Sequence, residues 1–118
     1  MPDAKRTDRV GEEFREILAE EIPRLKDPRV GFVTVTGVDV SPDLRNAMVH
    51  YTAMGEETDR KATRAGLISA TGHLRQVIGR QVRLKFLPAL TFHEDDTEER
   101  AGRVEALLRE LRERDAAD

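Results

Sequence analysis

The sequence contains no cysteine and no tryptophan, and it has only one tyrosine and four phenylalanines. The absence of cysteine excludes disulfides, thiolate metal ligands and cysteine nucleophiles, and it fits a reducing compartment. With so few aromatic residues, there is little material for the stacking platforms on which RRM and OB-fold domains bind bases. No apolar run is long enough for a membrane span or a signal peptide. We therefore expect a cytoplasmic protein with no membrane partner.

A chain of 118 residues can bury one modest hydrophobic core and is too short for two. No internal repeat and no long linker divides it. We expect a single domain over residues 1–118, in which residues 115–118 form a short frayed acidic tail.

The net charge of −3 hides an uneven distribution of charge along the chain. Residues 60–85 carry seven Lys or Arg and no Asp or Glu, whereas the segments before and after them are both acidic. A run of mixed charges usually forms a solvated surface, but seven bases without an intervening acid favour a surface that binds anions. Both interpretations stay open at this point.

The first half of the chain predicts a helix followed by a β-hairpin. The apolar stripe of the helix consists of Val10, Phe14, Ile17, Leu18 and Ile22, and Pro23 should end it. The β-branched segment VGFVTVTGVDVS changes the parity of its valines at Gly37, which predicts a strand with a one-residue bulge. A second strand is predicted because Ala47, Val49, Tyr51 and Ala53 alternate with Met48, His50, Thr52 and Met54.

The second half predicts two successive helices, a strand and a last helix. Thr58 or Asp59 should cap the first of these helices, and the helical face restarts at Leu74 and ends at Gly79 and Arg80. The apolar parity of residues 82–92 predicts a third strand, in which Pro88 requires an edge position or a bulge. Asp96 and Glu99 have capping-box spacing before a final helix, which we expect to cover the core. The apolar residues of this helix are Ala101, Val104, Leu107, Leu108 and Leu111.

The order of these elements predicts an α+β fold with a small three-stranded mixed sheet, because the hairpin is antiparallel and the two-helix crossover permits a parallel pair. Helix, strand, strand, helix, kink, helix, strand is the order of a type II KH-like domain, here with an added C-terminal helix. The kink is expected at Ala70, Thr71, Gly72 and His73. No Gly-x-x-Gly loop, with which KH domains hold an RNA backbone, stands at this junction.

Three stretches of the sequence resemble the ribosome-binding factor A family. They are LKDPRVGFVTVTGVDVSPDL (25–44), ATGHLRQVIGRQVRLKFLPALTF (70–92) and KRTDRV (5–10). In that family an Ala-x-Gly kink between two helices replaces the Gly-x-x-Gly loop, and the resemblance implies that residues 70–72 are this kink. It also implies a non-enzymatic factor that binds the free 30S ribosomal subunit, supports late maturation and 5′-end processing of 16S rRNA, and is important in the cold.

The kink also has a physical interpretation that is independent of the family. A break there leaves backbone N–H groups open at the start of the second helix, where the helix dipole favours a phosphate. The alternative is that Gly72 is present only for close helix packing. Because its flanks carry no acid, we favour phosphate binding. The candidate RNA contacts are Arg60, Lys61, Arg64, Arg75, Arg80, Arg83 and Lys85, with Lys5, Arg6 and Arg9 as auxiliary contacts.

No other site is expected from the sequence. Consecutive residues such as His93 to Asp96 at a strand end cannot all converge on one metal ion, and His50 and His73 have no nucleophile or carboxylate at a recognisable spacing. We therefore expect no catalytic residues, no metal, no cofactor and no small-molecule substrate, and a monomer. The alternative function is a KH-like module that docks on an acidic protein partner without direct RNA contact.

Overall fold

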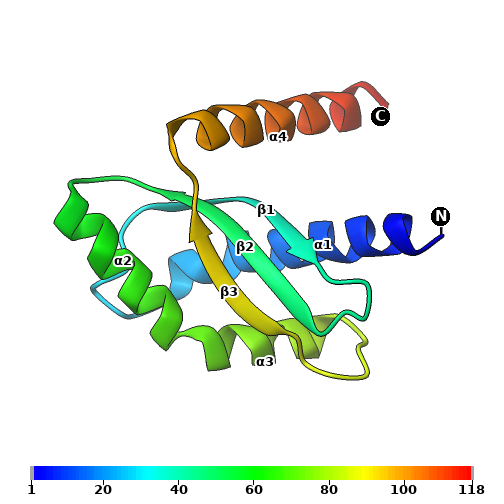
Figure 1. Ribbon diagram of the computed structural model, residues 1–118, viewed down its shortest axis with the longest axis horizontal. Coiled ribbons are helices and arrows are strands. Elements are labelled where there is room, and N and C mark those ends of the chain that lie inside the picture. The colour runs from blue at the N-terminus through cyan, green and yellow to red at the C-terminus, as the bar shows by residue number, and fades with distance from the viewer. Residues whose placement is uncertain (1, 118) are drawn as a thin grey trace.

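The computed structural model describes the backbone of residues 2–117 and the side chains of residues 6–96 and 101–115. Its elements are α1 (Pro2–Glu21), a 3-10 turn η1 (Ile22–Arg24), β1 (Val33–Val40), β2 (Asn46–Ala53), α2 (Glu57–Ser69), α3 (Thr71–Gln81), β3 (Ala89–Glu94) and α4 (Thr97–Ala117). This is the α+β order of a type II KH-like domain with an added C-terminal helix, so the predicted fold class is confirmed (Figure 1).

The sheet is mixed and has the strand order β1-β2-β3. β1 pairs antiparallel with β2, and β3 pairs parallel with β2 on its other side. The register of the hairpin shifts between Val35 and Gly37, which confirms the bulge predicted from the change of parity. Thr36 is the extra residue, and the bulge brings valines on both sides of it toward the core.

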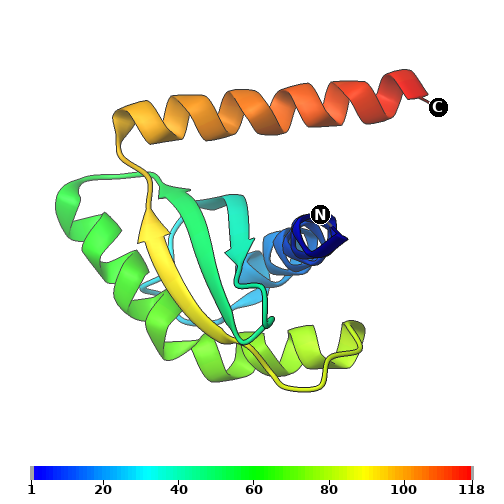
Figure 2. The same cartoon turned by 45° about the vertical axis from the view of Figure 1, so that its right-hand side comes forward.

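One face of the sheet and the helices α1, α2 and α3 enclose the core (Figure 2). The predicted stripe of α1 is buried over its whole length, and the alternating residues of β2 that face the same side are buried with it. The fully buried side chains at the centre include Phe14, Leu18, Val49, Tyr51, Leu67, Leu74 and Ile78. The apolar periodicity of α1 and β2 was therefore a sound guide to the core.

The start of α2 differs slightly from the prediction. Its N-cap is Glu56, where Thr58 or Asp59 was expected. Asp59 instead occupies the third helical position, and its carboxylate accepts a hydrogen bond from the Glu56 backbone N–H at 3.0 Å. The Glu56 side chain in turn accepts a hydrogen bond from the Asp59 backbone N–H, which completes a capping box. The helix therefore begins earlier than a cap at Thr58 or Asp59 would give.

The third strand is shorter than predicted. Residues 82–88 lie outside the sheet, and β3 begins at Ala89, directly after Pro88. Proline has no N–H to donate to a strand ladder, and Phe86 and Leu87 are both exposed to solvent. Arg83 and Lys85 therefore lie on a loop between α3 and β3, where we had expected a strand.

α4 does not cover the core, which corrects the expectation from its apolar residues. Leu108 is 50% exposed and Leu111 38% exposed, and no described residue of α4 belongs to the buried core. The helix lies along the β1 side of the molecule, apart from α2 and α3 (Figures 1 and 2). The Asp96–Glu99 capping box cannot be placed, because the Glu99 side chain lies outside the described residues. The helix continues to Ala117, within the segment 115–118 that we expected to fray, and Asp118 lies outside the described residues.

Ion pairs attach α4 to the rest of the protein. Arg103 Nε lies 3.2 Å from the buried carboxylate of Asp95, and Arg114 reaches Glu12 and Glu16 on α1 at 3.0 Å each. Hydrogen bonds from Arg15 and charges from Arg15 and Arg114 hold the pKa of Glu12 below its ordinary value. A carboxyl group with a depressed pKa stabilises the fold at neutral pH and loses this contribution as acid protonates it. The attachment of α4 should therefore weaken in acid.

None of the described helices is both long enough and apolar enough to cross a membrane.

α1 packs closely against the sheet at Gly11. A Cβ added to this residue would lie 2.5 Å from the carbonyl oxygen of Val38 on β1, which is backbone and cannot rotate away. We predict that Gly11→Ala lowers the free energy of unfolding by about 1–3 kcal/mol in urea denaturation, because overpacking moves α1 off β1.

The control is Gly102→Ala, since nothing lies within 4 Å of a Cβ placed on that helical glycine. This variant should be neutral or more stable by up to about 1 kcal/mol. Equal effects of the two substitutions would contradict the close packing of α1 on β1.

Candidate nucleic-acid interface

The seven basic residues of the segment 60–85 lie on three consecutive elements. Arg60, Lys61 and Arg64 are on α2, Arg75 and Arg80 are on α3, and Arg83 and Lys85 are on the α3–β3 loop. Because these positions differ in their contacts with the rest of the protein, they are not equally available to a phosphate.

The three basic residues of α2 have partners within the protein. Arg60 Nη1 lies 3.3 Å from a carboxylate oxygen of Glu94, and Arg64 Nη1 donates to the carbonyl oxygen of Phe92 at 2.8 Å. These two contacts tie α2 to β3. Lys61 lies 3.3 Å from Glu57 on the same helix, in an exposed pair that contributes little energy. Arg60 and Arg64 therefore have a structural role, and Lys61 keeps a largely solvated charge.

Arg75 is also engaged, although it was a leading candidate for a phosphate contact. Its Nε donates to the carbonyl oxygen of Pro88 at 2.8 Å, and its Nη2 donates to that of Leu87 at 3.1 Å. The guanidinium thus holds the end of the α3–β3 loop against α3. Nothing in the sequence pattern around Arg75 indicates this contact, because both acceptors are backbone atoms.

Arg80, Arg83 and Lys85 are exposed and make no hydrogen bond or ion pair among the side chains that the structure describes. An exposed guanidinium or ammonium group without an internal partner can bind a phosphate without first breaking a contact. Among the predicted contacts, these three residues are therefore the best placed for an RNA backbone.

Two further bases come from parts of the chain outside the segment 60–85. Arg6 on α1 and Arg45 on the β1–β2 turn line a surface pocket of about 370 Å³ together with Arg83 and Lys85. Arg6 was predicted as an auxiliary contact, and Arg45 was missed, although it directly follows the turn residues SPDL. Arg9 is exposed but does not line this pocket, and the side chain of Lys5 lies outside the described residues.

The kink between α2 and α3 is centred on Ala70, which caps both helices with φ −84° and ψ −2°. The Leu74 N–H donates to the Ala70 carbonyl at 2.9 Å, which is the first bond of the new helix. The N–H groups of residues 71–73 come before it and form the open end of α3. The His73 side chain is paired with Glu21 of α1 at 2.9 Å, so this residue joins two helices.

Gly72 is not needed for packing or for backbone geometry. Nothing lies within 4 Å of a Cβ placed on it, and its φ is not in the left-handed region. The close-packing alternative for this glycine is therefore wrong. Gly66 shows the contrast, since a Cβ there would lie 2.5 Å from Val30 Cγ2. The phosphate-binding interpretation of Gly72 stays a prediction.

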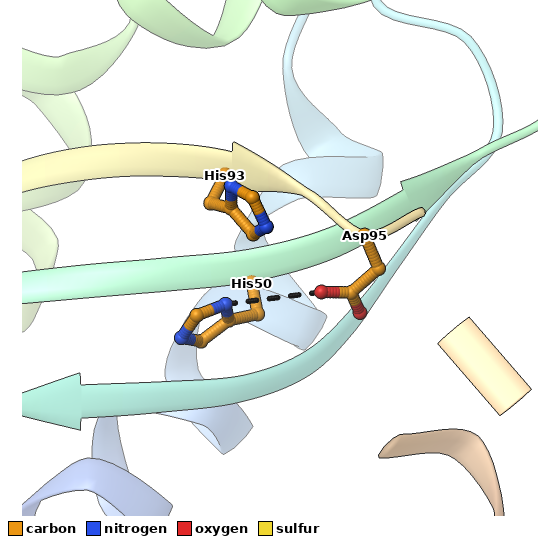
Figure 3. A group of neighbouring side chains, drawn as sticks. All are labelled: His50, His93 and Asp95. Carbon is orange, nitrogen blue, oxygen red and sulfur yellow. Dashed lines mark ion pairs between the residues drawn. The ribbon is translucent and has the colours of Figure 1, made fainter. Parts of the chain in front are cut away.

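A separate polar cluster lies on the other face of the sheet, at the end of β3 (Figure 3). His50, for which no carboxylate stood at a recognisable spacing in the sequence, is buried, and its Nε2–H donates to Asp39 at 2.7 Å. Its Nδ1 faces the Asp95 carboxylate at 3.8 Å, and the His93 ring packs edge-on beside it. Neighbouring strands thus bring His50, His93 and Asp95 together, which a search for ligands along the sequence could not find.

The surroundings of Asp95 indicate a structural role for this cluster. The Thr36 hydroxyl donates to Oδ2 of Asp95 at 2.6 Å, and the Arg103 guanidinium stands beside Oδ1. Because Arg103 Nε lies 3.2 Å from this oxygen, the Asp95 carboxylate already has a cationic partner within the protein. The cluster joins the bulge of β1, the end of β3 and the first part of α4, and we assign it no part in the interface.

Comparisons with known proteins agree in the family that they indicate. The family model described as "Ribosome-binding factor A" matches residues 6–108. The ribosome-binding factor A of Geobacter sulfurreducens is 44% identical over 114 residues, which cover 96% of this chain and 97% of that protein. Among solved structures, the crystal structure of ribosome-binding factor A from Thermus thermophilus superposes with a TM-score of 0.67 and 32% identity, over 75% of this chain and 94% of that one.

A second Thermus thermophilus structure is a homology model of ribosome-binding factor A fitted into the cryo-EM map of a 30S complex. It matches with a TM-score of 0.63 and 32% identity, over 74% of this chain and 92% of that chain.

The different roles of Arg75 and Arg80 can be tested by stability alone. We predict that Arg75→Ala lowers the free energy of unfolding by about 1.5–3 kcal/mol, because charge-assisted hydrogen bonds to the Leu87 and Pro88 carbonyls are lost. Arg80→Ala, the same truncation on the same helix, should change it by no more than about 0.5 kcal/mol. Urea denaturation measures both, and similar values for the two variants would contradict the assignment.

Proposed function

The chain belongs to the ribosome-binding factor A family, and from this premise we propose that it binds the free 30S ribosomal subunit through contacts with 16S rRNA. In this proposal it acts during late maturation of the subunit and supports processing of the 5′ end of 16S rRNA, most importantly in the cold. It works in the cytoplasm as a monomer, by binding and not by catalysis. It needs no cofactor and no small-molecule substrate.

The observation that carries this proposal is the group of exposed bases around the α3–β3 loop. Arg80, Arg83 and Lys85 have no polar partner among the described side chains, and Arg6 and Arg45 extend the same surface from two other segments. An RNA backbone offers regularly spaced phosphates to such a surface, and each contact releases a counterion. Duplex RNA is recognised largely through its shape and backbone, which suits a surface of this kind.

The proposal predicts that the protein sediments with free small subunits in a sucrose gradient at low magnesium and is absent from translating ribosomes. The triple substitution of Arg80, Arg83 and Lys85 to Glu should abolish this association. It should leave the thermal melt nearly unchanged, since exposed substitutions usually alter stability by about 0.5 kcal/mol or less. For the wild-type protein, binding should fall steeply with salt. Replacing the three bases with Ala should reduce the log–log slope by roughly 2–3.

A matched control is the triple substitution of Lys26, Arg109 and Arg112 to Glu. These residues are also exposed and the change in net charge is the same, but they lie outside the basic segment. The control should still bind. If both triple variants lose binding equally, net charge explains the result and the site is wrong. An association that resists nuclease would favour docking on an acidic protein.

Gly72→Ala separates access to the kink amides from folding. A Cβ at this position meets nothing in the protein, so the variant should be as stable as the wild type or gain up to about 1 kcal/mol. If a phosphate approaches these amides, subunit binding should fall about tenfold or more, since hydrogen bonds to charged groups contribute roughly 1.5–3 kcal/mol.

Cells that carry only Gly72→Ala should grow near normally when warm and accumulate free subunits with 5′-extended rRNA in the cold. Primer extension on 16S rRNA measures this. Correct 5′ ends in chilled cells, with the variant protein shown to be present and folded, would count against both the kink contact and the role in processing.

A further inference from the structure

An exposed aromatic ring lies within the basic pocket beside the α3–β3 loop. Phe86 is 47% exposed, and the guanidinium carbon of Arg45 lies 4.3 Å from the centroid of its ring. The ammonium group of Lys85 is also near the ring, at 5.6 Å. The α3–β3 loop and the β1–β2 turn lie side by side at the same end of the molecule (Figures 1 and 2). Segments far apart in sequence thus supply a phenyl ring and a planar cation to one place.

The pocket is strongly positive. Arg6, Arg45, Arg83 and Lys85 line it, and Asp43 is the one acid among its lining residues. The Asp43 carboxylate accepts hydrogen bonds from the Ser41 hydroxyl at 2.6 Å and from the Arg45 N–H at 3.1 Å. These bonds lower the pKa of Asp43, and they direct its oxygens into the turn. The net charge of the pocket therefore favours an anion.

The apolar part of the pocket favours a flat ligand that carries this charge. The apolar surface between the basic residues comes from Pro42, Leu44, Leu84 and Phe86. A site for phosphate alone does not need an exposed phenyl ring. Burying that ring inside the protein would be more favourable than exposing it to water. An unpaired nucleotide combines a flat base that stacks on an aromatic ring or an arginine plane with a phosphate for the cations. A volume of about 370 Å³ is also within the range of pockets that hold small ligands.

We propose that this pocket binds an unpaired RNA nucleotide, with its base stacked on Phe86 and its flanking phosphates on Arg6, Arg83 and Lys85. The inference rests on the proposed function and makes it more specific, because a base that reaches this pocket must be unstacked from its RNA helix. The chain has too few aromatics for a stacking platform with several rings, but one ring is enough for one base. The protein would then recognise single-stranded rRNA next to the RNA backbone that its basic residues contact.

The test compares a fluorescently labelled single-stranded RNA decamer with a decamer of the same length whose nucleotides are all abasic. Both carry the same phosphates, so contacts with phosphate alone bind them equally. The wild-type protein should bind the normal decamer roughly 5- to 150-fold more tightly in anisotropy at low salt, because stacking of one base contributes about 1–3 kcal/mol. Phe86→Leu, which keeps an apolar side chain, should remove this preference and leave binding of the abasic decamer unchanged.

Phe86→Trp provides a direct readout, because the sequence contains no other tryptophan. Its fluorescence should be quenched by the normal decamer and not by the abasic one, and it should keep the affinity of the wild type. Circular dichroism melts of both variants establish that they fold. Equal affinity of the wild-type protein for the two decamers, including no binding of either, would overturn the stacking proposal. Subunit binding is decided independently of this result, by sedimentation of the wild-type protein with free small subunits.

Discussion

The hydrogen bonds from the Arg75 guanidinium to the carbonyl oxygens of Leu87 and Pro88 determine where the basic surface lies. Pro88 cannot donate to the sheet, so residues 82–88 have no strand ladder to hold them. The Arg75 side chain supplies part of the missing constraint, and Val82 and Leu84 supply more of it by packing against the core. The absence of a side chain at Gly79 also makes room for Leu87. The loop therefore stays close to α3, and its cations stay near Arg80. The exposed cations of the loop stay together because one cation, Arg75, is used inside the protein.

The acid-free segment 60–85 predicted a candidate site, but the sequence could not show which of its basic residues are free to bind. Arg80, Arg83 and Lys85 are exposed in the structure and have no hydrogen bond or ion pair among the described side chains. The sequence could not separate Arg80 from Arg60, Arg64 and Arg75, because the partners of these three lie 34, 28 and 13 residues away along the chain. Two of the partners are backbone carbonyl oxygens, which every residue has, so the sequence gives no sign of them. Arg45 was missed for the opposite reason, since the fold brings a distant turn to the loop.

The fold was predictable wherever one local pattern was sufficient. The apolar stripe of α1, the alternation along β2 and the change of parity at Gly37 each depend on neighbours in sequence, and each was right. The errors arose where an element depends on contacts made elsewhere. No carboxylate stood at a recognisable spacing from His50 in the sequence, but Asp39 pairs with it and Asp95 faces it from other parts of the chain. α4 has the leucines of a core helix, but the face of the sheet that α1, α2 and α3 cover is already occupied, so it is attached by ion pairs.

The acidic parts of the protein also bear on the proposed binding of RNA. With a net charge of −3, a protein of uniform charge would be weakly repelled by a polyanion. Here α4 and the α3–β3 loop lie at opposite ends of the molecule in both views (Figures 1 and 2), and the chain from residue 86 onward has twice as many acids as bases. In the proposed function, this separation of charge would attract RNA to the loop and repel it from α4, which favours encounters in the orientation that binding needs. A small negative total charge would also keep the affinity low for RNA that does not match the loop. An acidic helix that touches no core can therefore improve specificity by discouraging the wrong approach, provided that its ion pairs keep it on the side away from the bases.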